Sequence, residues 1–240
     1  MINRIINEKI RKTLFKGKAI ILIGCRQIGK TTSLNEIFSV ENDVLWLSGD
    51  DSDTRDLFEN ITSDRLKTIF GNKKIIVIDE AQRIADVGLK LKLITDNIND
   101  LQLVATGSSA FELADKTKES LTGRKREFQM YPLSFKEMVE HHGFITERRL
   151  LQHRLVYGYY PEVVTNPGDE KLILKSLSDS YLYKDVLALD YIKKSDKLIK
   201  LLQALAYQIG SQVSYNELSQ IVGVDSKTIE KYIQILEKCY

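Results

Sequence analysis

The stretch at residues 24–31, which reads GCRQIGKT, constrains the fold of this chain more than any other. It follows an apolar run at residues 19–24 and precedes a helical pattern at residues 31–40. A glycine-rich turn between a strand and a helix, ending in lysine and threonine, matches the phosphate-binding pattern G-x-x-x-x-G-K-[ST]. The alternative is a glycine turn that carries an exposed lysine. The pattern predicts an α/β fold whose first strand leads into a phosphate site.

The residue types in this loop suit phosphate chemistry. Gly24 and Gly29 allow the backbone to curl so that its amides can point at an anion. The N-terminus of the following helix, which contains Thr32, adds positive potential. Lys30 can reach the β- and γ-phosphates of a nucleotide, and the hydroxyl of Thr31 can bind Mg²⁺. We therefore expect ATP and Mg²⁺ at this loop.

A second group of candidate residues ends the apolar run at residues 73–82, which reads KKIIVIDEAQ. A buried strand that ends in two carboxylates is unusual, because removing carboxylates from water is costly. We expect Asp79 to lie near Mg²⁺ and Glu80 to act as the general base that orients the attacking water. The alternative is that Glu80 only caps the next helix. Together with the loop, these residues predict an Mg²⁺-dependent ATPase.

A third candidate element is LVATGSS at residues 103–109. Thr106, Ser108 or Ser109 could bind the γ-phosphate or the attacking water from a strand between the other two, or the serines could simply start the next helix. The GTPase pattern D-x-x-G is not matched, because Asp79 is followed by Glu-Ala-Gln, and no LSGG signature of ABC ATPases occurs. The combination favours an ATPase of the additional-strand, catalytic-glutamate type.

Strand and helix patterns alternate along the first part of the chain, which is typical of a mainly parallel sheet flanked by helices. The apolar runs are nearly continuous, as in strands buried on both faces. Helical patterns alone follow after about residue 135. The fold class predicted is an α/β P-loop NTPase core, followed by a helical region. The expected strands lie at residues 19–24, 43–51, 73–82, 101–109 and 125–134.

The composition excludes several classes of protein. Of the 240 residues, 43% are hydrophobic, which is enough for a core, and the net charge of +2 gives no global reason to expect nucleic acid. Cys25 and Cys239 are far apart and form no metal-ligand pattern, which favours a reducing compartment, the cytoplasm. No apolar run approaches the roughly 18 residues of a membrane span, so no membrane role is expected.

These residues together resemble a known family, the prokaryotic AAA-type ATP-binding proteins with an AAA_14-like core and a C-terminal DUF4143 domain. The resemblance covers nearly the whole chain and implies a P-loop ATPase core, a helical region and a winged-helix-like module. It rests on GCRQIGKTT, IVIDEAQ, ATGSSAFEL, ESLTGRKREFQMYPLSFKE, YGYYPEVV and SYNELSQIVGVDSKTIEKYIQILEKCY, in the family's order.

The resemblance implies three further features. Arg124, in the family's Gly-Arg pair, is a candidate arginine finger or sensor, in cis or in trans; the alternative is a salt bridge remote from the phosphate. Cys25 stands where the family usually has proline. The family continues beyond Tyr240, so we expect that this chain is truncated before the DUF4143 domain. The residues reveal no role for YGYYPEVV at 157–164.

The final part of the chain has a helix-turn-helix pattern. Ser214 and Glu217 form a candidate capping box, Gly223 ends one helix, and Ser226 starts the next. We therefore expect three parts, which are an AAA-type ATPase core at 1–150, a helical lid-like region at 151–205, and a helix-turn-helix or partial winged helix at 206–240.

Several partners stay open. The segment 214–239 could bind DNA through Lys227, Lys231 and Lys238, or it could pack as a lid, because acidic residues are interspersed with the lysines. The chain could be an ATPase coupled to a lid, a nucleotide-gated regulator of DNA or protein binding with slow hydrolysis, or a DNA-binding regulator with a secondary P-loop domain. A second copy of the chain or another protein is a further candidate partner.

Overall fold

The computed structural model describes residues 2–59, 61–107, 117, 120–181 and 195–239. Contacts divide the chain into two compact units, residues 1–171 and 172–240, which are described separately. Among the described residues, no helix combines the length and the apolar composition that crossing a membrane requires. The expected three-part division of the chain stays a prediction.

The larger unit is built on a five-stranded sheet with the order β2-β3-β4-β1-β5. All four strand pairs are parallel, which confirms the predicted sheet. The position of β4 between β1 and β3 confirms the additional strand expected from the sequence. The strands are β1 (Ala19–Gly24), β2 (Val44–Ser48), β3 (Ile75–Asp79), β4 (Gln102–Gly107) and β5 (Lys125–Met130).

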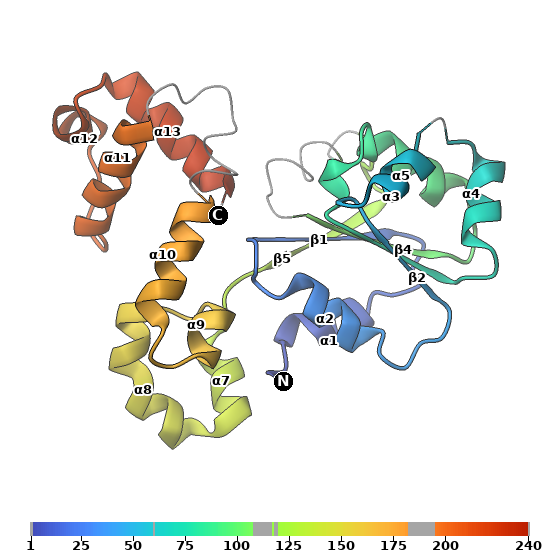
Figure 1. The fold of residues 1–240 in the computed structure, drawn as a ribbon, viewed down its shortest axis with the longest axis horizontal. Coiled ribbons are helices and arrows are strands. Elements are labelled where there is room, and N and C mark those ends of the chain that lie inside the picture. Colours follow the sequence, from blue (N-terminus) through green and yellow to red (C-terminus); the bar gives the residue numbers. More distant parts are fainter. Residues whose placement is uncertain (1, 60, 108–116, 118–119, 182–194, 240) are drawn as a thin grey trace. The chain divides into compact units, whose positions relative to one another are not determined.

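Helices cover both faces of this sheet, as Figure 1 shows. The alternating side chains of β1 explain why, since Ile20 and Leu22 belong to one apolar cluster and Ile21 and Ile23 to the other. The first cluster includes residues of α1 and α2, and the second includes residues of α4 and α5. The helices are α1 (Ile5–Arg11), α2 (Lys30–Ile37), α3 (Ser52–Leu57), α4 (Ser63–Phe70) and α5 (Val87–Asn97).

Three helices follow β5 within the larger unit, namely α7 (Phe135–His142), α8 (Phe144–Tyr157) and α9 (Pro161–Thr165). A fully buried carboxylate on α8, that of Glu147, contacts both α7 and the segment that precedes α9. Glu147 accepts a hydrogen bond of 2.6 Å from the hydroxyl of Tyr159, and its other oxygen lies 2.7 Å from Nε2 of His142. Burial and the neighbouring carboxylate of Glu147 raise the pKa of Tyr159 to about 12, so this hydroxyl stays protonated.

The smaller unit is helical. It contains α11 (Ser195–Tyr207), α12 (Tyr215–Val222) and α13 (Ser226–Cys239), which share one apolar core, while α10 (Glu170–Tyr181) spans the boundary between the units. Gly223 ends α12 in the left-handed conformation with φ 72°, as its position in the pattern predicts. The helix pair therefore forms as expected, whereas its identity as a DNA-binding module stays a prediction.

Gly49, directly after β2, allows β2 to end against β3. Its amide donates to the carbonyl of Asp79 at 2.8 Å, and a Cβ at this position would lie only 2.3 Å from the carbonyl oxygen of Glu80. The carbonyl oxygen of Glu80 belongs to the backbone, so it cannot rotate away from an added methyl group. The sequence pattern gave no role to this glycine, although its amide binds the carbonyl of Asp79 and its lack of a side chain leaves room for the carbonyl of Glu80.

We predict that Gly49→Ala destabilises the protein by about 3 kcal/mol, because the added methyl group displaces the end of β3. Urea unfolding of the full chain measures the change. Gly17→Ala is the matched control, because Gly17 has no heavy atom near its Cβ position and only its φ of 67° is strained, at a cost of about 1 kcal/mol. Equal losses in the two variants would contradict the prediction.

Candidate functional site

The glycine-rich loop connects β1 to α2 at the carboxyl edge of the sheet. Gly29 has φ 94°, which favours glycine at the start of α2. Gly24 is the partner of Met130 in the parallel register, and a Cβ on Gly24 would lie 2.7 Å from the carbonyl oxygen of Met130. Gly24 is therefore required by the close approach of β5, in addition to the phosphate chemistry that the motif predicts.

Lys30 lies over this loop with only 5% of its side chain exposed. Its Nζ donates to the carbonyl of Gly24 at 2.8 Å and to that of Cys25 at 3.0 Å. Nζ also lies 4.0 Å from Oε1 of Glu80. Burial lowers the pKa of Lys30, and the charges of Glu80 and Asp79 partly counteract this effect. The loop thus holds a cation at the position where the motif predicts phosphate contacts.

The two predicted Mg²⁺ ligands, Thr31 and Asp79, lie in direct contact. The hydroxyl of Thr31 donates to Oδ2 of Asp79 at 2.7 Å. The other oxygen, Oδ1, accepts a hydrogen bond from the hydroxyl of Thr106, which is fully buried at the end of β4. Thr106 was a candidate for the γ-phosphate contact, but in the structure its hydroxyl is engaged with Asp79. It therefore orients the carboxylate.

Glu80 follows Asp79 in the left-handed conformation, with φ 47°. Its backbone amide donates hydrogen bonds to Oδ1 of Asp79 at 3.2 Å and to the hydroxyl oxygen of Thr106 at 3.1 Å. Its side chain makes no capping hydrogen bond to the short helix η1 (Ala81–Arg83), as the alternative interpretation would require. Instead, Oε2 accepts from the buried amide of Gln82 at 2.5 Å. Sequence reasoning missed Gln82, although it is part of DEAQ.

Thr31 and Asp79 fit a magnesium ion by their chemistry. Mg²⁺ prefers oxygen ligands and is usually held by one or two protein groups together with substrate phosphates. Within the described ranges, no group of three or more His, Cys, Asp or Glu side chains could hold a metal by itself. A hydroxyl and a carboxylate at 2.7 Å, next to a phosphate loop, are therefore a suitable partial ligand set.

Arg124 is not brought to this site. It precedes β5, and its carbonyl accepts from the amide of Ala19, at the amino end of β1. The phosphate loop begins five residues further along β1, about 17 Å away at roughly 3.3 Å per residue. Its Nε lies 2.5 Å from Oδ1 of Asp96. In this structure Arg124 therefore lies away from the loop at residues 24–31, and its role as an arginine finger or sensor, in cis or in trans, stays a prediction.

The remaining predicted residues have different outcomes. Thr32 lies in the first turn of α2 and is exposed. Ser108 and Ser109 lie outside the described residues, so their expected contacts stay predictions. The motif YGYYPEVV, which had no assigned role, contacts the loop, because the hydroxyl of Tyr160 donates to the carbonyl of Arg26. No local pattern in the sequence indicates this contact.

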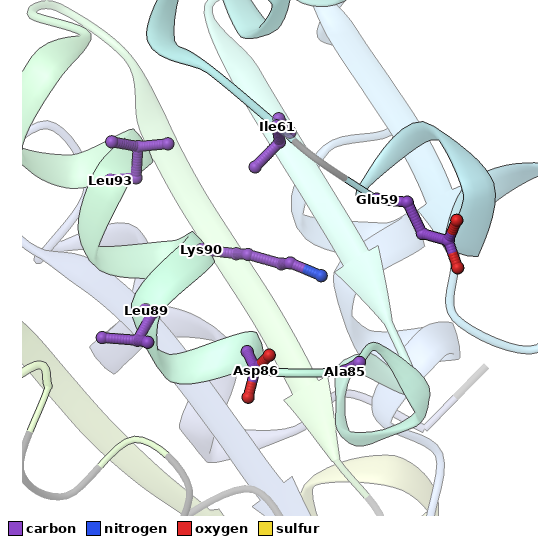
Figure 2. Close-up of a pocket in the computed structure, with 7 residues that line it drawn as sticks. All are labelled: Glu59, Ile61, Ala85, Asp86, Leu89, Lys90 and Leu93. Atoms are coloured by element: carbon purple, nitrogen blue, oxygen red, sulfur yellow. The ribbon is translucent and has the colours of Figure 1, made fainter.

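A separate pocket of about 660 Å³ lies between α5 and the segment after α3. Figure 2 shows Lys90 extending from α5 into this pocket, with Glu59 and Ile61 on its far side. It is lined by none of the residues of the phosphate site, so it is not part of the candidate site. Its remaining lining residues are Ala85, Asp86, Leu89 and Leu93.

Two family models match the chain. The model of the AAA domain (AAA_14) matches residues 16–139, just over half of the chain, and a domain of unknown function (DUF8612) matches residues 148–240. The chain therefore belongs to the AAA domain family. The model at the C-terminus differs from the DUF4143 domain that the resemblance implied, and both that domain and the truncation before it stay predictions.

Similar proteins include one from Methanocaldococcus jannaschii, described as uncharacterised, with 27% identity over 98% of this chain and 58% of its own length. An uncharacterised protein of Haemophilus influenzae is 29% identical over 76% of this chain and 46% of its own length. The chain thus spans about half the length of these curated relatives. A Walker-type ATPase of Pyrococcus abyssi shares the fold, with a TM-score of 0.62 and 16% identity, covering 100% of this chain and 90% of that one.

We predict that Thr106→Val lowers the contribution of Mg²⁺ to ADP binding by about tenfold, because Asp79 loses the hydroxyl that orients it. The measurement is the ADP dissociation constant in Mg²⁺ and in EDTA. Thr106→Ser keeps the hydroxyl and should retain the wild-type ratio of the two constants. A wild-type ratio in Thr106→Val would show that Thr106 does not position Asp79.

Proposed function

We propose that this AAA-domain chain binds ATP with Mg²⁺ at residues 24–31 and hydrolyses it with Glu80 as the general base. One observation carries the proposal. Two strands that are separated by β4 bring a buried lysine, a hydroxyl and two carboxylates to one edge of the sheet. Thr31 lies 2.7 Å from Asp79, and Lys30 lies 4.0 Å from Glu80.

Each residue has a distinct role in this proposal. Lys30 would turn its ammonium from the loop carbonyls to the phosphate oxygens of ATP. Thr31 and Asp79 would hold Mg²⁺, which compensates phosphate charge when it is bound. The curled loop would supply amides to the phosphates. Together they would fix the γ-phosphorus with respect to Glu80, which is the main contribution of proteins to phosphoryl transfer.

Glu80 would move the proton in the chemical step. Its carboxylate would accept a proton from a water whose oxygen attacks the γ-phosphorus, while the bond from that phosphorus to the bridging oxygen breaks and ADP leaves. Gln82 fixes Oε2 of Glu80, so Oε1 is the oxygen that faces Lys30 and the phosphate loop. Gln82 is thus a positioning residue for the base.

The finer expectations remain part of the proposal. Docking of DNA on residues 214–239 and donation of Arg124 to a second subunit are hypotheses with no supporting contact among the described residues. Coupling of the nucleotide state to a lid at 151–205 is also a hypothesis, and the contact of Tyr160 with the carbonyl of Arg26 is compatible with it. A nucleotide-gated regulator with slow hydrolysis is the alternative function. Because the curated relatives are longer, the driven process and the partners belong to proposals about the whole protein.

We predict that Lys30→Ala weakens MgADP binding by at least about a hundredfold, because a charge-assisted contact to phosphate is lost from a buried site. Isothermal titration calorimetry measures the dissociation constant. Lys12→Ala is the matched control, because Lys12 is largely exposed and pairs with the exposed Glu8. Equal affinity of Lys30→Ala and wild type would exclude this loop as the nucleotide site.

Glu80→Gln separates binding from hydrolysis. We expect it to bind MgATP as tightly as wild type and to lose hydrolysis by about a thousandfold, because the amide cannot accept the proton. Single-turnover conversion of radiolabelled ATP measures the rate. Hydrolysis at the wild-type rate would remove Glu80 from the role of base, while the assignment of the binding site would stand.

A further inference from the structure

Four carbonyls of the loop at residues 24–31 accept hydrogen bonds from side chains, and two of these side chains come from outside the loop. Lys30 occupies the carbonyls of Gly24 and Cys25, as described above. The next two acceptors, the carbonyls of Arg26 and Ile28, receive hydrogen bonds from Tyr160 and Arg4. These two donors are separated by more than 150 positions in the sequence. The loop is therefore held by the two ends of the larger unit.

Arg4 is a buried donor to the loop. Its Nη1 donates to the carbonyl of Ile28 at 3.2 Å, and its Nη2 donates to the carbonyl of Tyr131. Its Nε lies 3.2 Å from Oε1 of Glu137, and both side chains are at least 92% buried. A guanidinium with three acceptors in a fixed fork has one geometry, which an ammonium cannot reproduce.

Glu137 holds Arg4 in place from the start of α7. Its Oε1 also accepts from the amide of Ile5 at 2.9 Å, and its Oε2 accepts from the amide of Ser134 at 2.8 Å in a capping box. Burial alone would raise the pKa of Glu137, but these amides and the charge of Arg4 outweigh burial and lower it. The carboxylate is thus charged and fully engaged, and Arg4 has a fixed counterion.

Tyr160 is the second external donor to the loop. It directly precedes α9, and its ring is packed against the apolar cluster that contains Ile28 and Leu34. Its backbone is fixed by its neighbour, because the amide of Leu133 donates to the carbonyl of Tyr159 at 2.9 Å. The hydroxyl therefore reaches Arg26 from a segment whose backbone is hydrogen-bonded to the residues after β5.

We propose that Arg4, Glu137 and Tyr160 form a brace that holds the phosphate loop in its nucleotide-binding conformation. A curled loop whose carbonyls are bonded outward keeps its amides for the concave side, where an anion binds. Removing a brace contact lowers the fraction of molecules with a competent loop, and the apparent affinity for nucleotide falls by the same fraction. This inference rests on the proposed function of the loop, and it makes the three residues positioning residues.

The brace also connects the loop to the helices after β5. Glu137 lies in the first turn of α7 and Tyr160 directly precedes α9, so nucleotide binding and the stability of these helices are coupled through the same contacts. Coupling of this kind is reciprocal, since a contact that favours binding is itself favoured by the ligand. This gives the YGYYPEVV segment a role that its sequence pattern does not indicate.

The test compares two adjacent tyrosines. Tyr160→Phe removes the hydroxyl that contacts the loop, and Tyr159→Phe removes the hydroxyl that contacts buried Glu147. The MgADP dissociation constant and the unfolding midpoint without nucleotide are measured for wild type, both tyrosine variants, Arg4→Lys and Lys30→Ala. We expect Tyr160→Phe and Arg4→Lys to weaken MgADP binding by about three- to tenfold. We expect Tyr159→Phe to lower the unfolding midpoint without weakening the binding of MgADP.

The possible outcomes separate the brace from the function on which it rests. Wild-type affinity in Tyr160→Phe, with binding lost in Lys30→Ala, would overturn the brace and leave the nucleotide site intact. Equal weakening by the two tyrosine variants would overturn it as well, because the effect would then be a general loss of structure. Absence of MgADP binding by wild type would overturn the proposed function and the brace together.

Discussion

The proposed phosphate site depends on the parallel insertion of β4 between β1 and β3. With neighbouring strands about 4.8 Å apart, the ends of β1 and β3 lie roughly 10 Å from each other. The side chains of Thr31 and Asp79 bridge this gap with a hydrogen bond of 2.7 Å, and Thr106 fills the space at the tip of β4. In the register, Leu22 is opposite Thr106 and Ile78 is opposite Ala105, so a slip of one residue would separate all three groups.

Much of this arrangement was predictable, because the signals are local in the sequence. The buried parallel strands β1 and β3 read as continuous apolar runs, and all five strands lie close to the positions that the sequence predicts. The loop at residues 24–31 combines glycines, a lysine and a threonine in a spacing that is typical of phosphate-binding loops. Asp79 ends a buried apolar strand, where a carboxylate is costly unless it has polar partners. The capping of α12 and its end at Gly223 also follow from short-range preferences.

The rest of the site could not be predicted, because it depends on contacts between residues far apart in the sequence. Gly49 is needed only because the carbonyl of Glu80 lies where its Cβ would be. Arg4 and Glu137 are separated by 133 positions, and neither lies in a pattern that indicates an ion pair. The position of Arg124 could not be predicted either, because the family motif does not indicate that it lies before β5 and pairs with Asp96. Charge and motif indicate what a residue can do, whereas the topology decides where it lies.

The most direct test of this account is phosphate release from ATP by the wild-type chain, measured in Mg²⁺ and in EDTA over a wide range of protein concentrations. We expect turnover in Mg²⁺ and none in EDTA, because Thr31 and Asp79 are placed to hold the ion that compensates phosphate charge. A steep rise of specific activity with concentration would indicate a group supplied by a second subunit. Tight binding of MgADP without phosphate release at any concentration would contradict the claim that this site hydrolyses ATP.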